Sequence, residues 1–397
     1  MYPIVTLKPR KETNVIFRHP WVFSGAIEKI DETITNGALV YVKNANNNII
    51  GTGTYSENSM IAVRIFDFNQ TEINLDWIKN RLIEANEKRI LLGYGPKTET
   101  TGFRLIFGES DSMPGLVIDR YENVFVLQIS TPGTENLRNL IKQALIDLYD
   151  PKAIIEKSGM PTRKEENMEE THEILYGELE NQNEIEFKEN GYKFISDPIN
   201  GQKTGYFLDQ KDLRAKIGTH SKDKKILNLF SYSGASGIYA MKNGASSVHN
   251  VDSSDLALLL CEKHAKLNKI KSKDFTTENA DIFNYMPEKD TNLYDMVIMD
   301  PPALIKSNKD IAQGQKAYHF LNRGALRLVK NNGIFVTSSC SHYMNEEDFS
   351  YMLRRASVQN NTSLSILNII RQAPDHPLSV YFPESSYLKT FICLVKK

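Results

Sequence analysis

The sequence predicts an α/β protein in which a C-terminal, doubly wound parallel sheet follows a small β domain and a central α+β domain. Strand-like and helical runs alternate after about residue 190, which is typical of βαβ units. Short β-rich runs separated by turn formers occupy the first 70 residues, and a β-β-α-β pattern lies between these two regions. A chain of 397 residues has room for three such domains, which we expect at 1–70, 71–187 and 188–397.

The composition is that of a globular protein in a reducing compartment. Hydrophobic residues make up 41% of the chain and charged residues 24%, which is ordinary for this class. The N-terminal residues lack the apolar segment of a signal peptide, and no apolar run approaches the ~20 residues that span a bilayer. Cys261, Cys340 and Cys393 lie far apart and form no C-x-x-C pair, which argues against disulfides and structural metal. We therefore expect a cytoplasmic protein without membrane contact or bound metal.

The charge is unevenly distributed along the chain. Residues 156–189 hold eleven acidic and four basic side chains, a balance of −7, so the net charge of −1 leaves +6 for the remainder. Basic residues gather in the first thirty positions, which is compatible with a polyanionic partner. A solvated surface of mixed sign explains the same charges equally well. Charge alone leaves both interpretations open.

The first domain is expected to be a small β barrel or sandwich. Three β-rich runs predict its strands: A-L-V-Y-V (38–42), N-N-N-I-I-G-T-G-T-Y (46–55) and I-A-V-R-I-F (61–66). From Leu75 to Leu92 the apolar residues recur at helical spacing, which predicts a helix that links two domains.

The central region predicts a small α+β domain. The runs G-L-V-I-D-R-Y (115–121) and V-F-V-L-Q-I (124–129) predict two strands, with Glu122 and Asn123 as their turn. An amphipathic helix near 134–149 and the strand-like run A-I-I-E-K (153–157) complete the pattern. We expect the acidic stretch that follows to lie at the surface rather than in the core.

The C-terminal region predicts five strands of a parallel sheet, with helices near 234–243, 254–268 and 312–330. The strand-like runs are K-I-L-N-L-F (225–230), S-V-H-N-V-D (247–252), F-T-T-E-N (275–279), Y-D-M-V-I-M-D (294–300) and G-I-F-V-T-S (333–338). In such sheets ligands gather outside the carboxyl ends of the strands. The residues that follow each strand are therefore the candidate site.

The first two strand ends suit a nucleotide-like ligand. The loop N-L-F-S-Y-S-G-A-S-G (228–237) has small residues that let a ligand approach the backbone, although it lacks a full G-x-G-x-x-G and also fits a plain turn. Asp252 follows the second strand, 24 residues beyond Asn228. A carboxylate there typically accepts hydrogen bonds from ribose hydroxyls, and it also suits a helix N-cap.

The other strand ends carry acidic residues and one cysteine. Asp281 follows the third strand and fits either an adenine contact or a loop aspartate. The prolines of Asp300-Pro301-Pro302 stiffen the loop after the fourth strand and hold the Asp300 carboxylate in one direction. Cys340 follows the fifth strand. Because strands one, four and five should be neighbours, the ligand loop, Asp300 and Cys340 are expected around one crevice.

Cys340 and Asp300 together fit methylation of cytosine. A buried free cysteine usually fills space, which remains the interpretation of Cys261 and Cys393. The serines beside Cys340 and its strand-end position favour a nucleophile. A thiolate that adds to C6 of cytosine makes C5 nucleophilic toward a methyl donor, and Asp300 can hydrogen-bond the N3/N4 edge of a flipped base. The sequence does not identify the base that removes the C5 proton.

An ordered set of motifs covers essentially the whole chain: L-K-P-R (7–10), H-P-W-V-F-S-G (19–25), F-R-L-I-F-G-E-S-D-S-M-P-G-L-V-I-D-R-Y (103–121), G-Q-K-T-G-Y-F-L-D-Q (201–210), N-L-F-S-Y-S-G (228–234), D-P-P (300–302), S-S-C-S (338–341), A-P-D-H-P (373–377) and Y-L-K (387–389). This set resembles the bacterial PUA-domain, class I S-adenosyl-L-methionine (SAM)-dependent methyltransferases that form 5-methylcytosine in large-subunit rRNA.

The resemblance implies a PUA-like RNA-binding first domain, a central EEHEE domain and a Rossmann-like methyltransferase domain. It implies large-subunit rRNA as partner, SAM as cofactor, Cys340 as nucleophile and a possible homodimer. The SAM contacts that it implies are Phe207, Ser231, Gly234, Asp252, Asp281 and Asp300. Neighbouring positions of the same motifs complete the expected cofactor site: Asp209, Gln210, Phe230, Ser233, Ser253 and Ile282.

Four alternatives remain open at this point. Enzymes that methylate exocyclic amines or purine rings commonly carry an aromatic residue where this chain has Ala303. Uridine-C5 methyltransferases tend to show Cys-Asn-Pro, whereas here Cys340 is followed by Ser341 and His342. An NAD-dependent dehydrogenase fits Asp252 but not the missing glycine fingerprint, and an RNA-binding ribosome-assembly factor could retain a vestigial SAM site. Many RNA cytosine-C5 enzymes also have a second cysteine at the position of Ala303.

Overall fold

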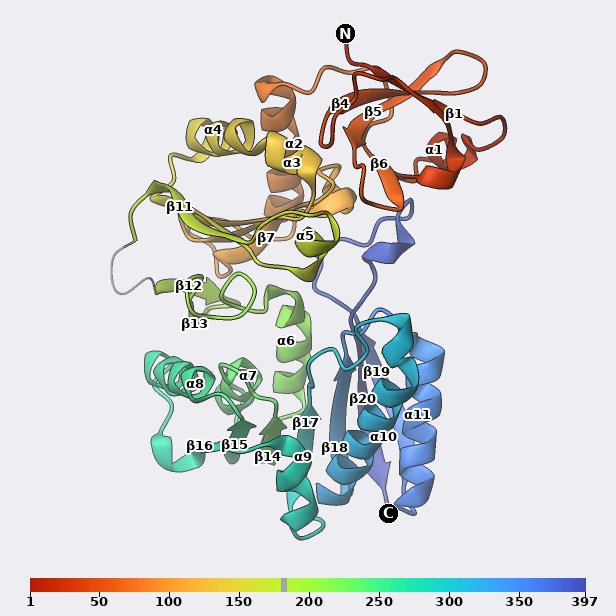
Figure 1. Cartoon of the computed structure of the whole chain (residues 1–397). Helices are drawn as coiled ribbons and strands as arrows, with labels where there is room; N and C mark the ends of the chain where they lie inside the picture. The colour runs from red at the N-terminus through yellow and green to blue at the C-terminus, as the bar shows by residue number, and fades with distance from the viewer. Residues whose placement is uncertain (180–183) are drawn as a thin grey trace. The chain divides into compact units, whose positions relative to one another are not determined.

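The computed structural model describes residues 1–179 and 184–397, which form two compact units (Figure 1). Unit 1 comprises Met1–Glu189, Ser196–Leu208 and Pro374–Ser385. Unit 2 comprises Asn190–Ile195, Asp209–Ala373 and Ser386–Lys397. The chain therefore passes between the two units several times, and each unit contains three separate segments of the sequence.

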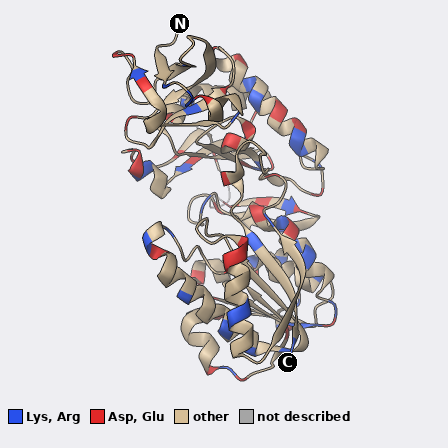
Figure 2. Cartoon of the chain, turned by 90° about the vertical axis from the view of Figure 1, so that its right-hand side faces the viewer, with Lys and Arg blue, Asp and Glu red and all other residues tan. Residues whose placement is uncertain are grey.

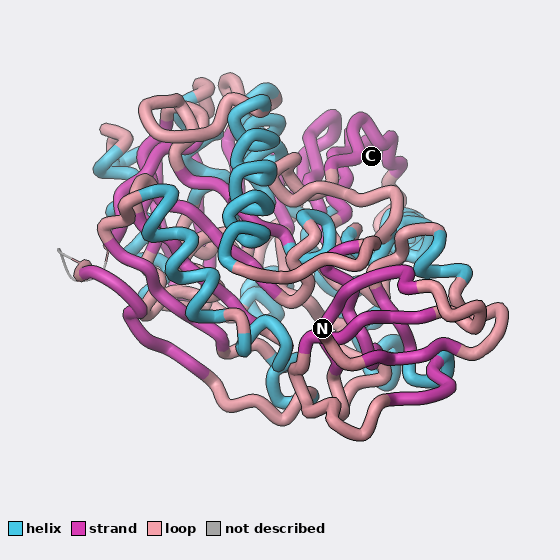
Figure 3. The backbone as a smooth tube through the Cα atoms, turned by 90° about the horizontal axis from the view of Figure 1, so that it is seen from above, coloured by secondary structure: helices cyan, strands magenta, loops and turns pink. Residues whose placement is uncertain are grey.

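The first sheet of unit 1 has six strands in the order β2-β6-β5-β4-β1-β3. Its elements are β1 (Ile4–Leu7), α1 (Thr13–Ile16), β2 (Trp21–Phe23), η1 (Ser24–Ala26), β3 (Ile27–Ile30), β4 (Leu39–Lys43), β5 (Ile49–Tyr55) and β6 (Ile61–Asp67). The three predicted runs form β4, β5 and β6. Figure 3 shows these N-terminal strands beside one another near the chain start. Buried valines and isoleucines from β1, β4 and β6 fill the core of this sheet.

The second sheet of unit 1 has five strands in the order β11-β10-β9-β8-β7. Its strands are β7 (Gly102–Phe107), β8 (Leu116–Tyr121), β9 (Val124–Ile129), β10 (Ala153–Ser158) and β11 (Thr171–Gly177), and its helices are α2 (Leu75–Leu91), α3 (Pro132–Asn136), α4 (Arg138–Tyr149) and α5 (Pro161–Glu165), with η2 at Gly108–Asp111. Glu122, with φ of 54°, turns the chain between β8 and β9 as expected. Apolar residues of α2 and α4 pack on this sheet, among them Ile78, Leu82, Ile141 and Leu145.

The acidic stretch was expected at the surface, and that expectation is wrong for Glu166 and Glu189. Their exposed fractions are 3% and 0%. The reason at Glu166 is a paired cation, because its Oε1 lies 2.8 Å from Nη2 of the half-buried Arg64. A paired carboxylate can leave water, whereas an unpaired one cannot. Residues 180–183 of the same stretch lie outside the described residues.

Two short strands, β12 (Ile185–Glu189) and β13 (Tyr192–Ser196), and η4 (Leu208–Gln210) lead along the chain into unit 2. Its sheet has seven strands in the order β16-β15-β14-β17-β18-β20-β19. The strands are β14 (Lys225–Leu229), β15 (Ser247–Asp252), β16 (Phe275–Asn279), β17 (Tyr294–Met299), β18 (Val329–Ser339), β19 (Ser363–Ile370) and β20 (Lys389–Lys396). The five predicted strands are present and parallel. The antiparallel pairing of β20 with β18 and β19 was not predicted.

Helices cover the sheet of unit 2, and Figure 1 shows α10 and α11 side by side. The helices are α6 (Lys211–Thr219), α7 (Ala235–Lys242), α8 (Asp255–Leu267), α9 (Ile282–Tyr285), α10 (Ile311–Leu328) and α11 (Glu346–Gln359), and the short 3-10 turns are η5 (Ser272–Asp274), η6 (Met286–Glu288), η7 (Asn308–Asp310) and, within unit 1, η8 (Pro383–Ser385). Tyr318, Leu321 and Ala325 of α10 are fully buried in the core with residues of β17 and β18. This packing fixes the strands whose ends were expected to form the site.

Two of the three cysteines fill space, as predicted. Cys261 in α8 and Cys393 in β20 are fully buried. Burial raises the pKa of the Cys393 thiol to about 12 and raises that of Cys261 further. Both sulfurs are therefore neutral at physiological pH, and neither is a candidate nucleophile.

Basic and acidic residues lie next to one another along the helices and loops drawn in Figure 2. Across the described residues, no helix combines the length and the apolar character that a membrane crossing needs.

Candidate active site

The ends of β14, β17 and β18 lie at one edge of the sheet in unit 2. β17 pairs in parallel with β14 on one side and with β18 on the other (Figure 1). The loop after β14, Asp300 after β17 and Cys340 after β18 therefore come to the same edge, as the sequence predicted. This edge is the candidate active site.

The loop after β14 is a tight turn with little freedom. Phe230, Tyr232 and Gly234 all have positive φ, at 55°, 45° and 71°. The N–H of Ser231 donates to Val251 O at 3.1 Å, and the N–H of Gly234 donates to Ser231 O at 2.8 Å. A Cβ at Gly234 would collide with Sγ of Cys261, so glycine is required both by backbone conformation and by space.

Asp252 supports this loop from the end of β15. Its Oδ2 accepts from the N–H of Tyr232 at 2.8 Å, and its Oδ1 accepts from the N–H of Ser254 at 3.0 Å. The N-cap of α8 is Ser254, whose Oγ accepts from Ala257 N, so Asp252 is not the capping residue. A carboxylate has about four acceptor sites, so the half-buried Asp252 keeps capacity for ligand hydroxyls. Ser253 beside it is exposed.

Of the two predicted site residues after β16, Asp281 is exposed and Ile282 is buried. Asp281 is the N-cap of α9, and its Oδ1 accepts from the N–H of Phe283 at 3.0 Å. Its carboxylate is exposed, so capping and a ligand contact can coexist. Ile282 has an exposed fraction of 2% and packs into the core, so its side chain is not presented at the surface.

Asp300 is oriented by a second predicted site residue. Nε2 of Gln210 donates to Oδ2 of Asp300 at 2.7 Å. Both side chains are half-buried, and Pro301 beside them is buried. The amide therefore fixes the direction of the carboxylate, in addition to the stiff proline loop.

Two other predicted residues of this motif, Asp209 and Phe207, have partners of their own. Asp209 has an exposed fraction of 6%, and its Oδ2 accepts from the hydroxyl of Tyr387 at 2.5 Å. Its carbonyl oxygen also accepts from Ala373 N at 2.7 Å, so Asp209 ties distant parts of unit 2 together. Phe207 belongs to unit 1, where Nζ of Lys203 lies 4.4 Å from the centroid of its ring.

Cys340 is half-buried, in contrast to the two other cysteines, and it lies in a turn held by serines. Ser341 Oγ accepts from the N–H of Ile305 at 3.2 Å and lies 3.0 Å from the hydroxyl of Tyr318. Ser339 Oγ donates to the same hydroxyl at 3.1 Å. Burial raises the pKa of Tyr318, so it stays protonated and can bridge the two serines. The network fixes the backbone on both sides of Cys340.

Tyr318 and Lys389 contact this turn, and neither was predicted from the sequence as part of the site. Tyr318 has a helical position in α10 that resembles any core tyrosine. Lys389 stands in the Y-L-K motif, but its contact with the turn after Cys340 depends on the antiparallel strand β20. A lysine directly before the apolar run T-F-I-C-L-V (390–395) was the one signal in the sequence that could have identified it.

The site fits a nucleoside-containing cofactor. Ser231 Oγ is buried at the turn after β14 and finds no hydrogen-bond partner among residues 1–179 and 184–397. With Asp252 at the next strand end, it offers polar groups at the place where a doubly wound sheet binds nucleotides. Within the described parts of the chain, no group of three or more His, Cys, Asp or Glu residues could hold a metal ion.

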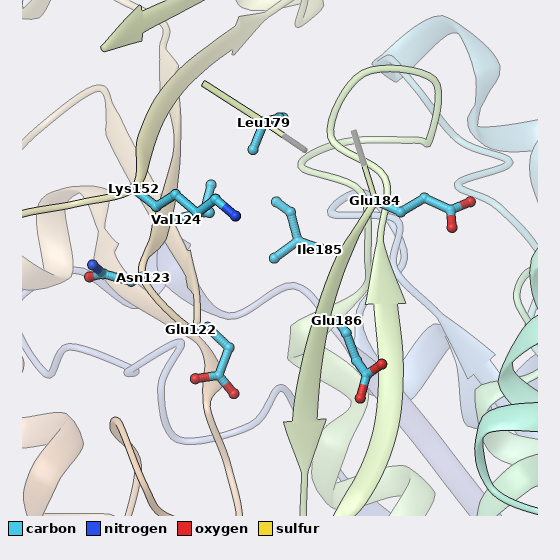
Figure 4. Close-up of a pocket in the computed structure, with 8 residues that line it drawn as sticks. All are labelled: Glu122, Asn123, Val124, Lys152, Leu179, Glu184, Ile185 and Glu186. Atoms are coloured by element: carbon cyan, nitrogen blue, oxygen red, sulfur yellow. The ribbon is translucent and has the colours of Figure 1, made fainter. Parts of the chain in front are cut away.

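A separate hollow lies in unit 1, between the turn after β8 and the start of β12 (Figure 4). Glu122, Lys152 and Glu186 project around it, together with apolar side chains. Its lining includes none of the predicted site residues. The strand ends of unit 2 therefore remain the candidate site.

His264 holds the loop after β14 in place, and protonation of this residue is expected to destabilise unit 2. Its Nε2 accepts from the N–H of Ile195 at 2.9 Å, so the proton is on Nδ1, which donates to Ser233 O at 2.9 Å. Burial lowers its pKa from 6.5 to about 4. The unfolded chain therefore binds a proton that the folded chain does not between these pH values.

The stabilisation by neutral His264 is complete above pH 6.5 and is lost as the pH falls toward 4, by about 3 kcal/mol. Urea unfolding of the wild type and of His264→Gln from pH 7 to pH 4 measures this. The variant should be less stable at pH 7 and should lose less stability on acidification. If the stability of the two proteins fell equally with pH, the acid sensitivity would not come from His264.

Comparisons with known proteins agree with this geometry. Residues 5–68 match the model of a PUA-like domain, and residues 117–379 match that of an S-adenosylmethionine-dependent methyltransferase. The chain is 36% identical over 381 residues to "Ribosomal RNA large subunit methyltransferase I" of Aliivibrio fischeri (strain MJ11), covering 95% of this chain and 96% of the relative. It is 35% identical to the protein of the same name from Vibrio vulnificus (strain YJ016), over 100% of both chains.

Solved structures agree in fold. A putative SAM-dependent methyltransferase from Streptococcus mutans superimposes with a TM-score of 0.83 at 22% identity, over 99% of this chain and 100% of that chain. A putative methyltransferase complexed with SAH superimposes with a TM-score of 0.82 at 23% identity, over 99% of both chains.

Proposed function

Because this chain belongs to the S-adenosylmethionine-dependent methyltransferases that carry an N-terminal PUA-like domain, we propose that it methylates carbon 5 of cytosine in large-subunit rRNA. The observation that carries the proposal is the pairing of β17 with β18, whose ends bear Asp300 and Cys340. A fixed carboxylate beside a half-buried cysteine suits attack on a pyrimidine ring. The relatives named as ribosomal RNA large subunit methyltransferases support rRNA as the substrate.

SAM supplies an electrophilic methyl group on its sulfonium and leaves as S-adenosylhomocysteine. Asp252 would accept hydrogen bonds from the ribose hydroxyls, and the buried Ser231 Oγ would gain the partner that it lacks within the described residues. Gly234 permits the tight turn that presents Ser231, because it tolerates a positive φ and leaves room for Sγ of Cys261. Asp281 would hold the adenine amine from the end of β16.

Cys340 would act as the nucleophile on the flipped base. Its thiolate forms a bond to C6, and the ring electron pair that this addition displaces becomes available at C5, which takes the methyl group. Asp300, held by Gln210 at 2.7 Å, would bind the N3/N4 edge and stabilise charge on the ring. Loss of the C5 proton to a base then restores the C5–C6 double bond and expels Cys340 as thiolate.

The test is to map 5-methylcytosine in rRNA from cells with and without this protein. The proposal expects one large-subunit cytosine to lose its C5 methyl group and to regain it when the wild-type gene is restored. Loss of a uridine-C5 or guanine methyl group instead would replace this proposal by one of the alternatives. Unchanged methylation of all rRNA positions would favour an assembly factor.

We further propose that unit 1 binds the RNA through exposed apolar, aromatic and basic residues of its PUA-like domain and of its segment Pro374–Ser385. Ile16, Phe17 and Tyr381 have exposed fractions of 59%, 73% and 50%. The guanidinium of Arg18 lies 5.9 Å from the centroid of the Tyr381 ring. Aromatic rings beside cations are the surface that unpaired nucleotides prefer, because bases stack and phosphates pair.

Tyr381→Ala is expected to weaken RNA binding by about tenfold, since stacking contributes roughly 1–3 kcal/mol per base. Arg18→Ala should also lower the slope of log affinity against log salt by about one. The matched control is Tyr351→Ala in unit 2, where a tyrosine of 53% exposure lies beside Arg354 in the same way. Filter binding of an rRNA fragment over a salt series measures both effects. Equal affinity of Tyr381→Ala and the wild type would contradict the surface assignment.

A further inference from the structure

Lys389 contacts the turn that carries the candidate nucleophile. It is the first residue of β20 and pairs in register with Ser339, the residue before Cys340. Its exposed fraction is 6%. Nζ donates to the carbonyl oxygen of Ser341 at 2.8 Å and to that of Met344 at 2.5 Å. One ammonium therefore holds both ends of the turn directly after Cys340.

Burial of the Lys389 ammonium is energetically costly, so neighbouring groups must stabilise its charge. Removing an ammonium from water costs several kcal/mol unless acceptors and counter-charges replace the water. Two carbonyl oxygens account for two of its three donors. Carbonyl groups are dipoles rather than charges, so they compensate only partly. A negative charge nearby would complete the compensation, and a thiolate at Cys340 can provide it.

The charged groups that face Lys389 agree with this pairing. Burial lowers the pKa of Lys389 to about 8, with Cys340 acting in the opposite direction. Arg371 lowers it further and Glu346 of α11 raises it. Nη2 of Arg371 and Oε2 of Glu346 are 2.7 Å apart, so the charges of that pair largely cancel. Tyr318 of α10 is neutral because burial raises its pKa. At neutral pH Lys389 is thus mostly protonated and acts on Cys340.

We propose that Lys389 is a positioning residue of the methylation reaction, which holds the turn of Cys340 and stabilises the Cys340 thiolate with its positive charge. The inference rests on the proposed nucleophilic role of Cys340. The thiol proton passes to solvent, Lys389 keeps its own proton, and no bond to Lys389 forms. An ammonium beside a thiol makes the thiolate accessible near neutral pH, as in other reactive cysteines.

The test measures alkylation of Cys340 by iodoacetamide as a function of pH, read by mass spectrometry of the Cys340 peptide. Cys261 and Cys393 are fully buried and serve as internal references. At pH 7 the alkylation rate should fall about tenfold in Lys389→Met. Loss of the cation is expected to raise the midpoint of the pH profile, which is the pKa of the Cys340 thiol, by about one unit. Lys389→Arg retains a cation and should keep most of the wild-type rate. Above about pH 8 Lys389 loses its proton, so the difference between wild type and Lys389→Met should shrink.

A purely structural lysine would lower the unfolding temperature of Lys389→Met without moving the pH profile, so superimposable profiles overturn the proposal. If Lys389→Met does not fold, the alkylation profile of the wild type alone still tests the proposal. Its midpoint must lie below the ~8.5 of an ordinary cysteine, and a midpoint at that value overturns the proposal. Alkylation needs neither SAM nor RNA. A shifted profile without cytosine methylation would refute the proposed function alone, and methylation with an unshifted profile would refute only the role of Lys389.

Discussion

Cys340→Ala is expected to abolish methylation of rRNA, by about four orders of magnitude or more in rate. Without the sulfur no bond to C6 forms, and C5 of cytosine stays too weak a nucleophile to take the methyl group. SAM affinity should be nearly unchanged, because the residues proposed to hold the cofactor follow β14, β15 and β16 rather than β18. Methyl transfer from radiolabelled SAM and calorimetric titration of SAM measure the two quantities.

The matched control is Cys393→Ala, which removes a fully buried sulfur from the neighbouring strand β20. It should cost about 1 kcal/mol of stability and leave the methylation rate close to that of the wild type. A Cys340→Ala enzyme that keeps wild-type activity would exclude Cys340 as nucleophile. Loss of SAM binding in the same variant would show that the turn, rather than the sulfur, was the essential feature.

Asp300→Asn is expected to lower kcat by about a hundredfold, the scale that one electrostatic contact to a developing charge contributes. The amide keeps the size of the carboxylate, and its oxygen can still accept from Gln210, whose Nε2 lies 2.7 Å from Oδ2 in the wild type. It cannot stabilise positive charge or accept from the base at N4 as strongly. Steady-state kinetics on an rRNA fragment measure the change.

Asp295→Asn is the control, because Asp295 lies on the same strand β17 at its other end. There it accepts from the N–H of Lys225 at 2.9 Å and from Lys330 Nζ at 2.8 Å. This variant should lose some stability and keep its kcat. Equal kcat values for Asp300→Asn and Asp295→Asn would remove Asp300 from the reaction.

Much of unit 2 could be predicted because its strands and helices alternate regularly along the chain. Apolar runs of five or six residues alternate with amphipathic helices, and parallel strands of that kind bring their carboxyl ends to one edge. That rule alone was enough to group Asp300, Cys340 and the loop of Gly234. The tight turn at Gly234 was also readable, since small residues mark a close approach of the backbone.

Residues whose role depends on distant pairing could not be predicted. Lys389 faces the turn of Cys340 only because β20 runs antiparallel to β18, and strand direction leaves little trace in a short apolar run. The hydrogen bond that Asp209 accepts from Tyr387, which lies 178 positions away in the chain, was not predicted either. Glu166 was expected at the surface because charge favours water, and its ion pair with the half-buried Arg64 stabilises it in the interior instead.

The most direct test of the account is trapping with rRNA that contains 5-fluorocytidine. Fluorine at C5 cannot leave as the proton does, so the enzyme and the RNA should remain joined after methyl transfer. The account predicts an adduct of wild-type protein and RNA that resists denaturation, requires SAM, maps to the Cys340 peptide and is absent from Cys340→Ala. Methylation of cytosine by the wild type without any trapped adduct, or an adduct at another residue, would contradict it.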